Sequence, residues 1–204
     1  MKIRLEEEKD YFEVENLTRE AFWNVYRPGC FEHLIVNKIR KDKCFVKDLD
    51  YVIEDDDKIV ANIIYAKTRL KFDNGKEKET LLFGPVSVLP EYQSKGYGSR
   101  IIEYTIDKAR KLGYKEIFIT GNPEYYKKFG FERASKYNVY YNGMDKLEEF
   151  PFFMVKILDY KNIDIYNSTY SDPECYSNIN EKELEEFDKK FPKKIKEKRQ
   201  GQLE

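Results

Sequence analysis

Two glycines and a lysine near the middle of the chain have the types and spacing to hold an anion. The stretch runs Gln93-x-x-Gly96-x-Gly98, with Lys95 directly before the first glycine. Small residues let successive backbone N–H groups point at one centre, and the start of a helix behind them adds partial positive charge. Without further support, such a pair of glycines is better explained by an ordinary turn between a strand and a helix.

Two well-known phosphate loops do not fit this spacing. A dinucleotide fingerprint requires G-x-G-x-x-G and a carboxylate at the end of the next strand. Here the first glycine is absent, and the next strand ends in Thr120-Gly121-Asn122. A P-loop requires its lysine after the last glycine, whereas Lys95 precedes Gly96. A pyrophosphate cradle built from backbone N–H groups is the phosphate-binding interpretation that remains.

The cysteines and the only histidine do not make a metal site in the sequence. Cys30, Cys44 and Cys175 are few, odd in number and widely spaced, which is typical of a reducing compartment. Cys30 and His33 form a C-x-x-H pair, but no second pair completes the four ligands of a zinc centre. We therefore expect no metal ion.

The elements that would position these residues follow from the periodicity of the apolar side chains. The expected helices cover residues 10–23, 30–41, 99–112 and 122–130, the last with Asn122 as N-cap and Gly130 as terminator. The expected strands cover residues 2–7, three segments within 49–90, and then 115–120, 136–141 and 151–158. This order, with a run of hairpins and one crossover helix, predicts a mixed α/β fold.

Turn residues separate the three strands within residues 49–90. Asp55 to Asp57 is expected to be a solvated hairpin tip, because a calcium loop needs ligands and a glycine at set spacings. Asn74-Gly75 suits a type I′ hairpin, in which both central residues have positive φ. Pro85 lies inside the third strand and cannot donate to a ladder, so we expect the strand to bulge or splay there.

Composition limits the class of protein. The chain has 204 residues, with 41% hydrophobic and 16% aromatic side chains, which suits one globular domain, or one domain with an appendage. Lys and Arg number 37 against 38 Asp and Glu, so no overall field draws the protein to nucleic acid or to an anionic membrane. The charged N-terminus has no signal-peptide pattern, and no segment has the apolar length of a membrane span. We expect a cytoplasmic location.

Two separate segments resemble one family. Residues 86–121 (VSVLPEYQSKGYGSRIIEYTIDKARKLGYKEIFITG) are similar to the acetyl-CoA-binding motif of the GNAT superfamily of acyl-CoA-dependent N-acyltransferases. That motif is a strand with V-x-P, then [RQ]-x-x-G-x-[GA], a helix and a strand. Residues 122–131 (NPEYYKKFGF) resemble the element that follows it in a bacterial subgroup, G-[DN]-P-x-Y-Y-x-x-F-G-F. The second match lies at the expected distance from the first, and the resemblance covers residues 1–158.

The resemblance implies a central, mostly antiparallel sheet that is splayed at the cofactor strand and flanked by helices. It implies a domain over residues 1–160 and leaves residues 161–204 as a polar C-terminal extension. Residues 180–191 of that extension read as a helix, on which Phe187 and Phe191 lie four apart and could anchor it to the domain.

The resemblance further implies the transfer of an acetyl group from acetyl-CoA to a primary amine, by direct attack in a ternary complex. The cofactor would then be held by residues of the strand, the loop and the short helix: Val86, Val88, Gln93, Ser94, Lys95, Gly96, Tyr97, Gly98, Ser99, Asn122 and Tyr126.

Two catalytic roles follow from the same resemblance. The backbone N–H of Val88, or of its neighbour Leu89, would stabilise the oxyanion. Tyr126 matches the general-acid tyrosine, because a phenol with a pKa near 10 is a plausible donor to a departing thiolate. Tyr125, its neighbour, points about 100° away on a helix and is not expected to share this role.

The general base is where the sequence departs from the family. Many relatives carry a glutamate in the strand before the cofactor loop, and residues 80–88 (TLLFGPVSV) contain no carboxylate. His33, with an unperturbed pKa near 6.5, is a weak base candidate beside Asp50 and Glu32, although a single histidine is more often structural.

The acceptor cleft and the partners are the least determined. By position in this fold the cleft would be lined by five residues: Trp23, Tyr26, His33, Tyr140 and Phe152. They fit a small-molecule or a peptide amine equally well, and the protein could be a monomer or a homodimer. Two other functions stay open. One is a non-catalytic acyl-CoA sensor, which the missing glutamate suggests, and the other is a protein that uses the loop for ATP or NAD.

Overall fold

The computed structural model describes residues 1–146, 148 and 150–202. These residues form two units, each with its own internal contacts. The first unit contains residues 1–64, 85–105 and 174–204, and the second contains residues 65–84 and 106–173. Each unit is described below by itself.

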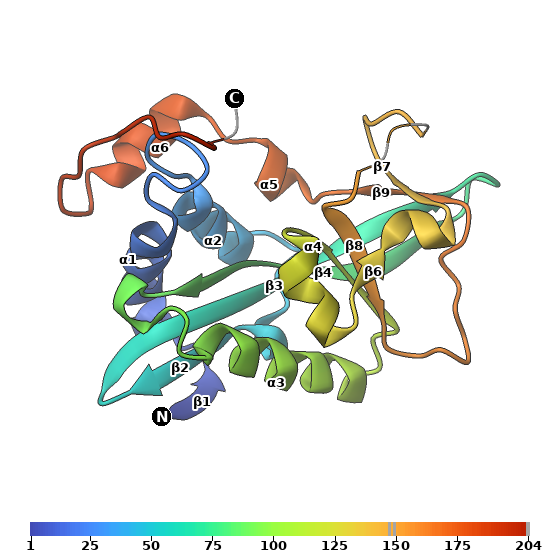
Figure 1. The fold of residues 1–204 in the computed structure, drawn as a ribbon, viewed down its shortest axis with the longest axis horizontal. Coiled ribbons are helices and arrows are strands. Elements are labelled where there is room, and N and C mark those ends of the chain that lie inside the picture. Colours follow the sequence, from blue (N-terminus) through green and yellow to red (C-terminus); the bar gives the residue numbers. More distant parts are fainter. Residues whose placement is uncertain (147, 149, 203–204) are drawn as a thin grey trace. The chain divides into compact units, whose positions relative to one another are not determined.

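The chain mixes helices with runs of consecutive strands (Figure 1). The strands are β1 Lys2–Leu5, β2 Tyr51–Asp55, β3 Lys58–Phe72, β4 Glu77–Val88, β5 Glu116–Thr120, β6 Glu132–Arg133, β7 Val139–Tyr141, β8 Phe153–Ile157 and β9 Ser168–Ser171. The α-helices are α1 Tyr11–Phe22, α2 Glu32–Lys41, α3 Tyr97–Lys111, α4 Pro123–Tyr126, α5 Glu174–Ser177 and α6 Glu181–Asp188. Among the described helices, none combines the length and apolar character that a bilayer crossing requires.

The strands form an open mixed sheet flanked by helices, as the sequence predicts. In the first unit β2 pairs antiparallel with β1 and with the first half of β3. In the second unit β4 and β5 are parallel, β8 is antiparallel to both β5 and β6, and β9 pairs with β3 and β7. The sheet is therefore antiparallel over most of its described pairs, and β4–β5 is the parallel pair that the crossover helix α3 requires.

Burial explains why these segments adopt these positions. Every residue from Ile59 to Ala66 is buried, which is the pattern of a strand covered on both faces. On α1, Val14, Leu17 and Thr18 are buried at helical spacing. The Ser87 hydroxyl of β4 donates to the Thr18 hydroxyl at 3.0 Å, and this bond fixes the strand on which the predicted cofactor site begins.

The hairpin turns correct one expectation. Between β2 and β3, Asp56 and Asp57 both have positive φ, which is the type I′ geometry, so the acidic run is a hairpin tip as expected. At the second turn Gly75 has φ +80°, but Asn74 does not have positive φ, so the predicted type I′ turn is wrong. Phe72 pairs with Lys76, so the hairpin loop has three residues. In loops of this length the last residue adopts the left-handed conformation, which is the position that Gly75 occupies.

The second unit contains two strands that the sequence pattern did not reveal. β6 has two residues, and β9 (STYS) is polar and lies in the segment expected to be an extension, yet its Tyr170 is buried. The strand predicted over 136–141 begins only at Val139, because residues 134–137 form a 3-10 turn that Asn138 ends in the left-handed conformation.

The end of the chain packs on α1 and α2 within the first unit. In Figure 1 the orange α6 lies beside these two helices. Leu184, Phe187 and Phe191 form a buried apolar cluster with Leu34 of α2. Beyond α6, the indole N–H of Trp23 donates to the Ile195 carbonyl at 2.9 Å. This segment is therefore part of the core of the first unit.

Candidate active site

The loop before α3 has the backbone geometry of a turn that presents N–H groups. Residues Pro90–Tyr92 form a 3-10 turn, and α3 starts at Tyr97, two residues earlier than predicted. Between them Ser94 has φ +60° and Gly96 has φ +89°. Gly96 can adopt this conformation without steric cost, and alternation between left- and right-handed residues turns successive amides toward one side.

The amides of this loop are unpaired among the residues that the structure describes. The N–H groups of Ser94, Lys95, Gly96, Tyr97 and Gly98 donate to no acceptor in the described part of the chain. Those of Tyr97 and Gly98 belong to the first turn of α3, where no intrahelical acceptor exists. The loop is exposed or half-buried throughout. Exposed, unpaired amides at a helix start are an anion-binding arrangement.

Two side chains of the loop hold its shape. The Gln93 side-chain amide donates to the Val88 carbonyl at 3.0 Å, which fastens the loop to the end of β4. The Tyr97 hydroxyl donates to the carboxylate of Asp55 at the β2–β3 hairpin tip. This bond raises the pKa of Tyr97. Hydrogen bonds from the Met1 amino group and from Tyr97 lower the pKa of Asp55. Sequence reasoning missed this role of Asp55, since no local pattern connects a hairpin tip with a helix start more than 40 residues later.

The strand before the loop exposes one side only. Val86 and Val88 are half-buried, whereas Ser87 between them is buried against α1. The Leu89 N–H donates to the Val60 carbonyl at 3.0 Å, so it is used within the sheet. This bond occupies one of the two oxyanion donors that the sequence left open, and the role of Val88 stays a prediction.

The irregularity expected at Gly84-Pro85 is visible in the backbone. Gly84 has φ +140°, a conformation that side-chain-bearing residues rarely adopt. The β4–β5 register consists of Leu81↔Ile117 and Leu82↔Phe118, both before this glycine. The splaying of the sheet at the cofactor strand stays a prediction.

Tyr126 lies in an aromatic cluster of the second unit. Its ring is 6.0 Å from that of Phe83 and 5.9 Å from that of Phe131. Asn122 caps α4 as predicted, by accepting from the Glu124 N–H at 3.0 Å. Tyr125 is exposed, and its ring meets that of Tyr126 edge-on, with the ring centres 5.0 Å apart. The two tyrosines are therefore in contact but differ in exposure, since Tyr126 is half-buried.

Gly121 makes room for the Tyr126 ring and was not singled out from the sequence. A Cβ at this position would lie 2.5 Å from Cε2 of Tyr126, which is closer than real carbon contacts occur. The sequence does contain a signal for Gly121, because it is the first residue of the G-N-P element. Only the packing of the ring explains why a glycine is needed.

His33 occupies a structural position. Its side chain is 0% exposed, with Nε2 3.0 Å from Oδ1 of Asp188 and Nδ1 3.5 Å from Sγ of Cys30. The order thiol, imidazole, carboxylate is that of a nucleophilic triad, but burial raises the pKa of the Cys30 thiol, which keeps it protonated and inert. A fully buried imidazole does not meet an incoming amine, so the geometry favours the structural role.

The other two base candidates are also occupied. Asp50 is buried beside Glu6 and Arg40 and accepts from the Asn62 amide at 3.2 Å. Burial raises the pKa of Asp50 and, together with Asp50 itself, raises that of Glu6 to about 10. Burial also raises the pKa of Glu32, whose carboxylate accepts from the Phe31 N–H at 3.0 Å.

The five residues expected in the acceptor cleft fall into both units. Trp23 and His33 are buried under the C-terminal segment, while Tyr26 is 50% exposed on the first unit. In the second unit Phe152 is 51% exposed, and Tyr140 lines a cavity of about 200 Å³ with the aromatic rings of Phe150 and Phe153. Their joint role stays a prediction.

Comparison with known proteins places the chain in a family. The family model described as "Acetyltransferase (GNAT) domain" matches residues 2–134. An uncharacterized N-acetyltransferase of Escherichia coli K12, YjhQ, is 29% identical over 98 residues, which are 48% of this chain and 54% of YjhQ. The uncharacterized N-acetyltransferase YhbS of the same strain is 22% identical over 139 residues, 68% of this chain and 78% of YhbS. The chain thus spans about half the length of the first of these relatives.

Solved structures agree on the fold. A GNAT family acetyltransferase from Brucella melitensis was crystallised in complex with acetyl-CoA, and its structure superposes with a TM-score of 0.69 at 24% identity. The superposition covers 86% of this chain and 97% of the Brucella chain. YhbS from Escherichia coli, crystallised in complex with CoA, gives a TM-score of 0.73 at 18% identity. This superposition covers 88% of this chain and 93% of the YhbS chain. Because the family model covers well over half of the chain, and because these structures share its open mixed sheet, the chain belongs to the GNAT family of acetyltransferases.

Proposed function

We propose that this protein transfers an acetyl group from acetyl-CoA to a primary amine. The observation that carries the proposal is the row of exposed, unpaired N–H groups from Ser94 to Gly98, which lies in the segment where the family match predicts the cofactor. The acetyl-CoA and CoA held by the two structural relatives support this choice of cosubstrate.

The loop binds the pyrophosphate in this proposal. Five backbone N–H donors and the positive end of the α3 dipole complement the negative charge of the phosphates, and Lys95 adds a side-chain cation. Lys95 has its ammonium 5.3 Å from the centre of the Tyr92 ring, so it is held near the loop. Val86 and Val88, on the half-buried side of β4, face the acyl arm through their backbone groups.

Val88 and Tyr126 act on the thioester. The amine nitrogen attacks the carbonyl carbon, and the Val88 N–H stabilises the oxygen that becomes negative. The C–S bond then breaks, and the thiolate takes the proton of the Tyr126 hydroxyl. The nitrogen gives up its own extra proton to solvent, and the Tyr126 phenolate regains a proton from solvent before the next turnover. An amide and free CoA are the products.

No side chain is assigned as the base, because His33, Asp50 and Glu32 each have partners inside the first unit. The acceptor must then arrive as the neutral amine. We expect kcat/KM to rise about tenfold per pH unit below the pKa of the amine, and this rise to follow the pKa of the acceptor when acceptors of different basicity are compared.

The test compares two neighbouring tyrosines. Tyr126→Phe should lower kcat by about 100-fold, because general acid catalysis contributes that much or more, while the Kd for acetyl-CoA stays within twofold. Tyr125→Phe removes the same atom from the exposed side of the same helix and should leave both constants unchanged. Equal rates for the two variants would remove the acid role of Tyr126.

A second experiment separates catalysis from binding alone. Calorimetry with CoA, ATP and NAD should show binding of CoA only. Binding of CoA without turnover over a broad panel of amines would instead indicate an acyl-CoA sensor, which the absence of a carboxylate in residues 80–88 also allows.

A further inference from the structure

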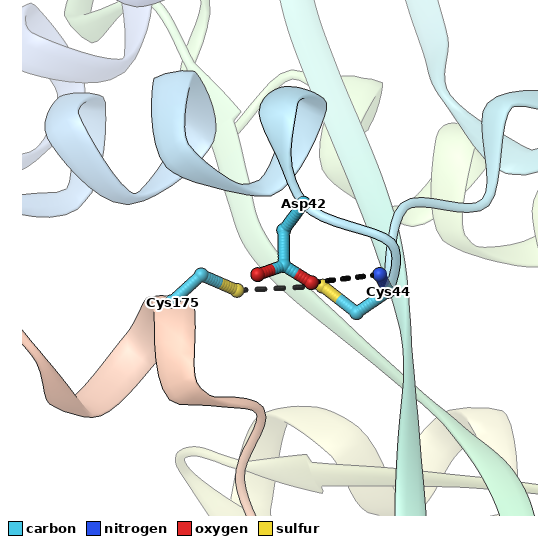
Figure 2. Close-up of side chains that lie close together, drawn as sticks. All are labelled: Asp42, Cys44 and Cys175. Carbon is cyan, nitrogen blue, oxygen red and sulfur yellow. Dashed lines mark hydrogen bonds between the residues drawn. The ribbon is translucent and has the colours of Figure 1, made fainter.

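Two cysteines that are far apart in the sequence meet in the first unit, together with a carboxylate. Cys44 lies in the loop directly after α2, and Cys175 lies on α5. Their sulfur atoms are 3.4 Å apart, although 131 positions separate them. Figure 2 shows that the Asp42 carboxylate points toward the same place, and one ligand atom from each of the three residues lies within 4.8 Å of the others.

We propose that Asp42, Cys44 and Cys175 form a binding site for one thiophilic divalent cation, of which Zn²⁺ is the representative. The proposal does not depend on the transferase activity. It concerns the C-terminal part of the chain, because Cys175 lies beyond residues 2–134 that the family model matches.

The distances suit such an ion. Two sulfurs bonded to one tetrahedral Zn²⁺ at about 2.3 Å lie about 3.8 Å apart. The observed separation of 3.4 Å is therefore reached by a shift of a few tenths of an ångström. Both thiol side chains are buried, so they need no reorganisation from solvent, and all three residues belong to one unit.

The ligand set is chemically coherent. Thiolates select soft and borderline metals such as Zn²⁺ over Mg²⁺ and Ca²⁺, and a carboxylate oxygen is an accepted third ligand. The Cys44 N–H donates to Oδ1 of Asp42 at 2.8 Å, which orients the carboxylate as an outer partner orients a metal ligand. Asp42 is partly exposed, so a water molecule can fill the fourth position.

Zn²⁺ binds the deprotonated form of a thiol, so its entry would release the thiol protons of Cys44 and Cys175 to solvent.

Such an ion would fasten the C-terminal segment to the loop after α2. Helix α5 has only four residues, and α6 follows it onto the α1–α2 surface. A metal bond at Cys175 would therefore hold the chain in place directly before α6 packs on its neighbouring helices. Metal binding to the folded chain should raise its thermal stability by mass action.

The experiment uses the full chain, purified with a phosphine reductant and freed of metal by a chelator. One equivalent of Co²⁺ should produce a sulfur-to-cobalt charge-transfer band that Zn²⁺ abolishes. At Zn²⁺ about 100 times its Kd, Tm should rise by roughly 5 °C or more. Mg²⁺ at the same concentration should produce neither effect.

Variants localise the site. Cys175→Ser should weaken Zn²⁺ binding by more than the roughly 10–100-fold that loss of an outer partner costs. Asp42→Asn keeps an oxygen for the Cys44 N–H and should weaken binding to a smaller degree. Cys30→Ala removes the cysteine outside the cluster and should leave the Co²⁺ band unchanged. Circular dichroism and CoA binding confirm that each variant is folded.

Three results would overturn the proposal. The first is a folded, reduced protein without a cobalt–sulfur band. The second is a band that persists in Cys175→Ser or disappears in Cys30→Ala. The third is a mass two hydrogens lower in protein purified without reductant, combined with no metal uptake after reduction, which would show that the pair forms a disulfide instead.

Discussion

At the level of single residues, the position of Tyr126 depends on the missing side chain of Gly121. The ring fills the space that a Cβ would take, at 2.5 Å from its ideal position. The proposed acid is therefore set by a neighbour that has no chemistry of its own.

Gly121→Ala should destabilise the protein by about 1–3 kcal/mol, because the methyl group forces the ring or the strand end to move. In a Tyr126→Ala background the same substitution should cost little, because the clash has been removed. Urea unfolding of the four proteins measures both costs. If Gly121→Ala costs the same in both backgrounds, the ring is not the reason for the glycine.

The buried carboxylates Glu6 and Asp50 give a second residue-level consequence. Glu6 is paired with Arg40 at 2.5 Å, but burial and the neighbouring Asp50 raise its pKa to about 10. The unfolded chain releases the proton of Glu6 near the ordinary glutamate pKa of about 4.3, whereas the raised pKa of the folded state retains it to higher pH. At Glu6 the folded state thus binds more protons over this range, so the contribution of this residue to stability falls as the pH rises from about 5 toward 10.

Glu6→Gln should remove this dependence, because the amide keeps the shape and cannot ionise. The stability of the variant relative to the natural protein should increase with pH between 5 and 9, by at most about 1.4 kcal/mol per pH unit for one proton. Urea unfolding at several pH values measures the difference. A difference that stays constant with pH would show that Glu6 is ionised in the folded protein.

At the level of elements, the loop before α3 depends on a backbone conformation. Gly96→Ala places a side chain at φ +89° and should raise the Kd for CoA about 5–10-fold, because the strained amides turn away from their common centre. Gly75→Ala is the matched control, since Gly75 has φ +80° at the β3–β4 hairpin tip and open space around it. Both variants should lose similar stability, and calorimetry should show weaker CoA binding in the first only.

Helix α6 is held by a buried ion pair as well as by its apolar face. Asp188 lies 2.8 Å from the Arg19 guanidinium, whose side chain is only 2% exposed, and 3.0 Å from His33. Burial alone would raise the pKa of Asp188, but its hydrogen bonds with His33 and Arg19 lower it. The stabilisation is therefore complete at neutral pH and is lost as the pH falls through that lowered pKa.

Asp188→Asn should destabilise the protein by about 3–5 kcal/mol at pH 7, because it leaves the Arg19 charge buried without its partner. The deficit should shrink below about pH 4, where the natural carboxyl group also loses its charge. Glu186→Gln, on the exposed side of the same helix, should change stability by less than about 0.5 kcal/mol. Equal effects of the two substitutions in thermal unfolding would show that Arg19 finds compensation elsewhere.

Sequence patterns predicted the elements whose signal is local. The alternation of apolar residues located α1, α2, α3 and β5 to within two residues, and Asn122 and Gly130 bounded the short helix as expected. The spacing of the glycines and the YYKKFGF element identified the family. These features depend on neighbours within one turn of helix or one strand.

What the sequence did not reveal depends on long-range packing. β9 is polar along its length and is a strand only because β3 and β7 pair with it. The contact of Cys44 with Cys175 and the bond of Tyr97 to Asp55 join segments with no shared pattern. His33 could be proposed as a base from its residue type, but its burial follows from a segment 155 positions later.

At the level of the whole molecule, β3, β4 and α3 each contribute residues to both units. A helix or strand that melts in one unit removes the hydrogen bonds that continue it in the other. We therefore expect one cooperative thermal transition, with equal calorimetric and van't Hoff enthalpies. CoA at about 100 times its Kd should raise Tm by roughly 5 °C or more without splitting the transition. Two separate heat-capacity peaks would show that the units unfold independently.

The position of Trp23 turns the docking of the C-terminal segment into an optical signal. It is the only tryptophan of the chain. Its N–H is bonded to the Ile195 carbonyl, and the Arg19 guanidinium lies 4.1 Å from the centre of its ring. Release of the segment would expose the indole to water and shift its emission to longer wavelength. The protein thus contains its own fluorophore at the contact between its family domain and its C-terminus, and no label is needed to follow that contact in real time.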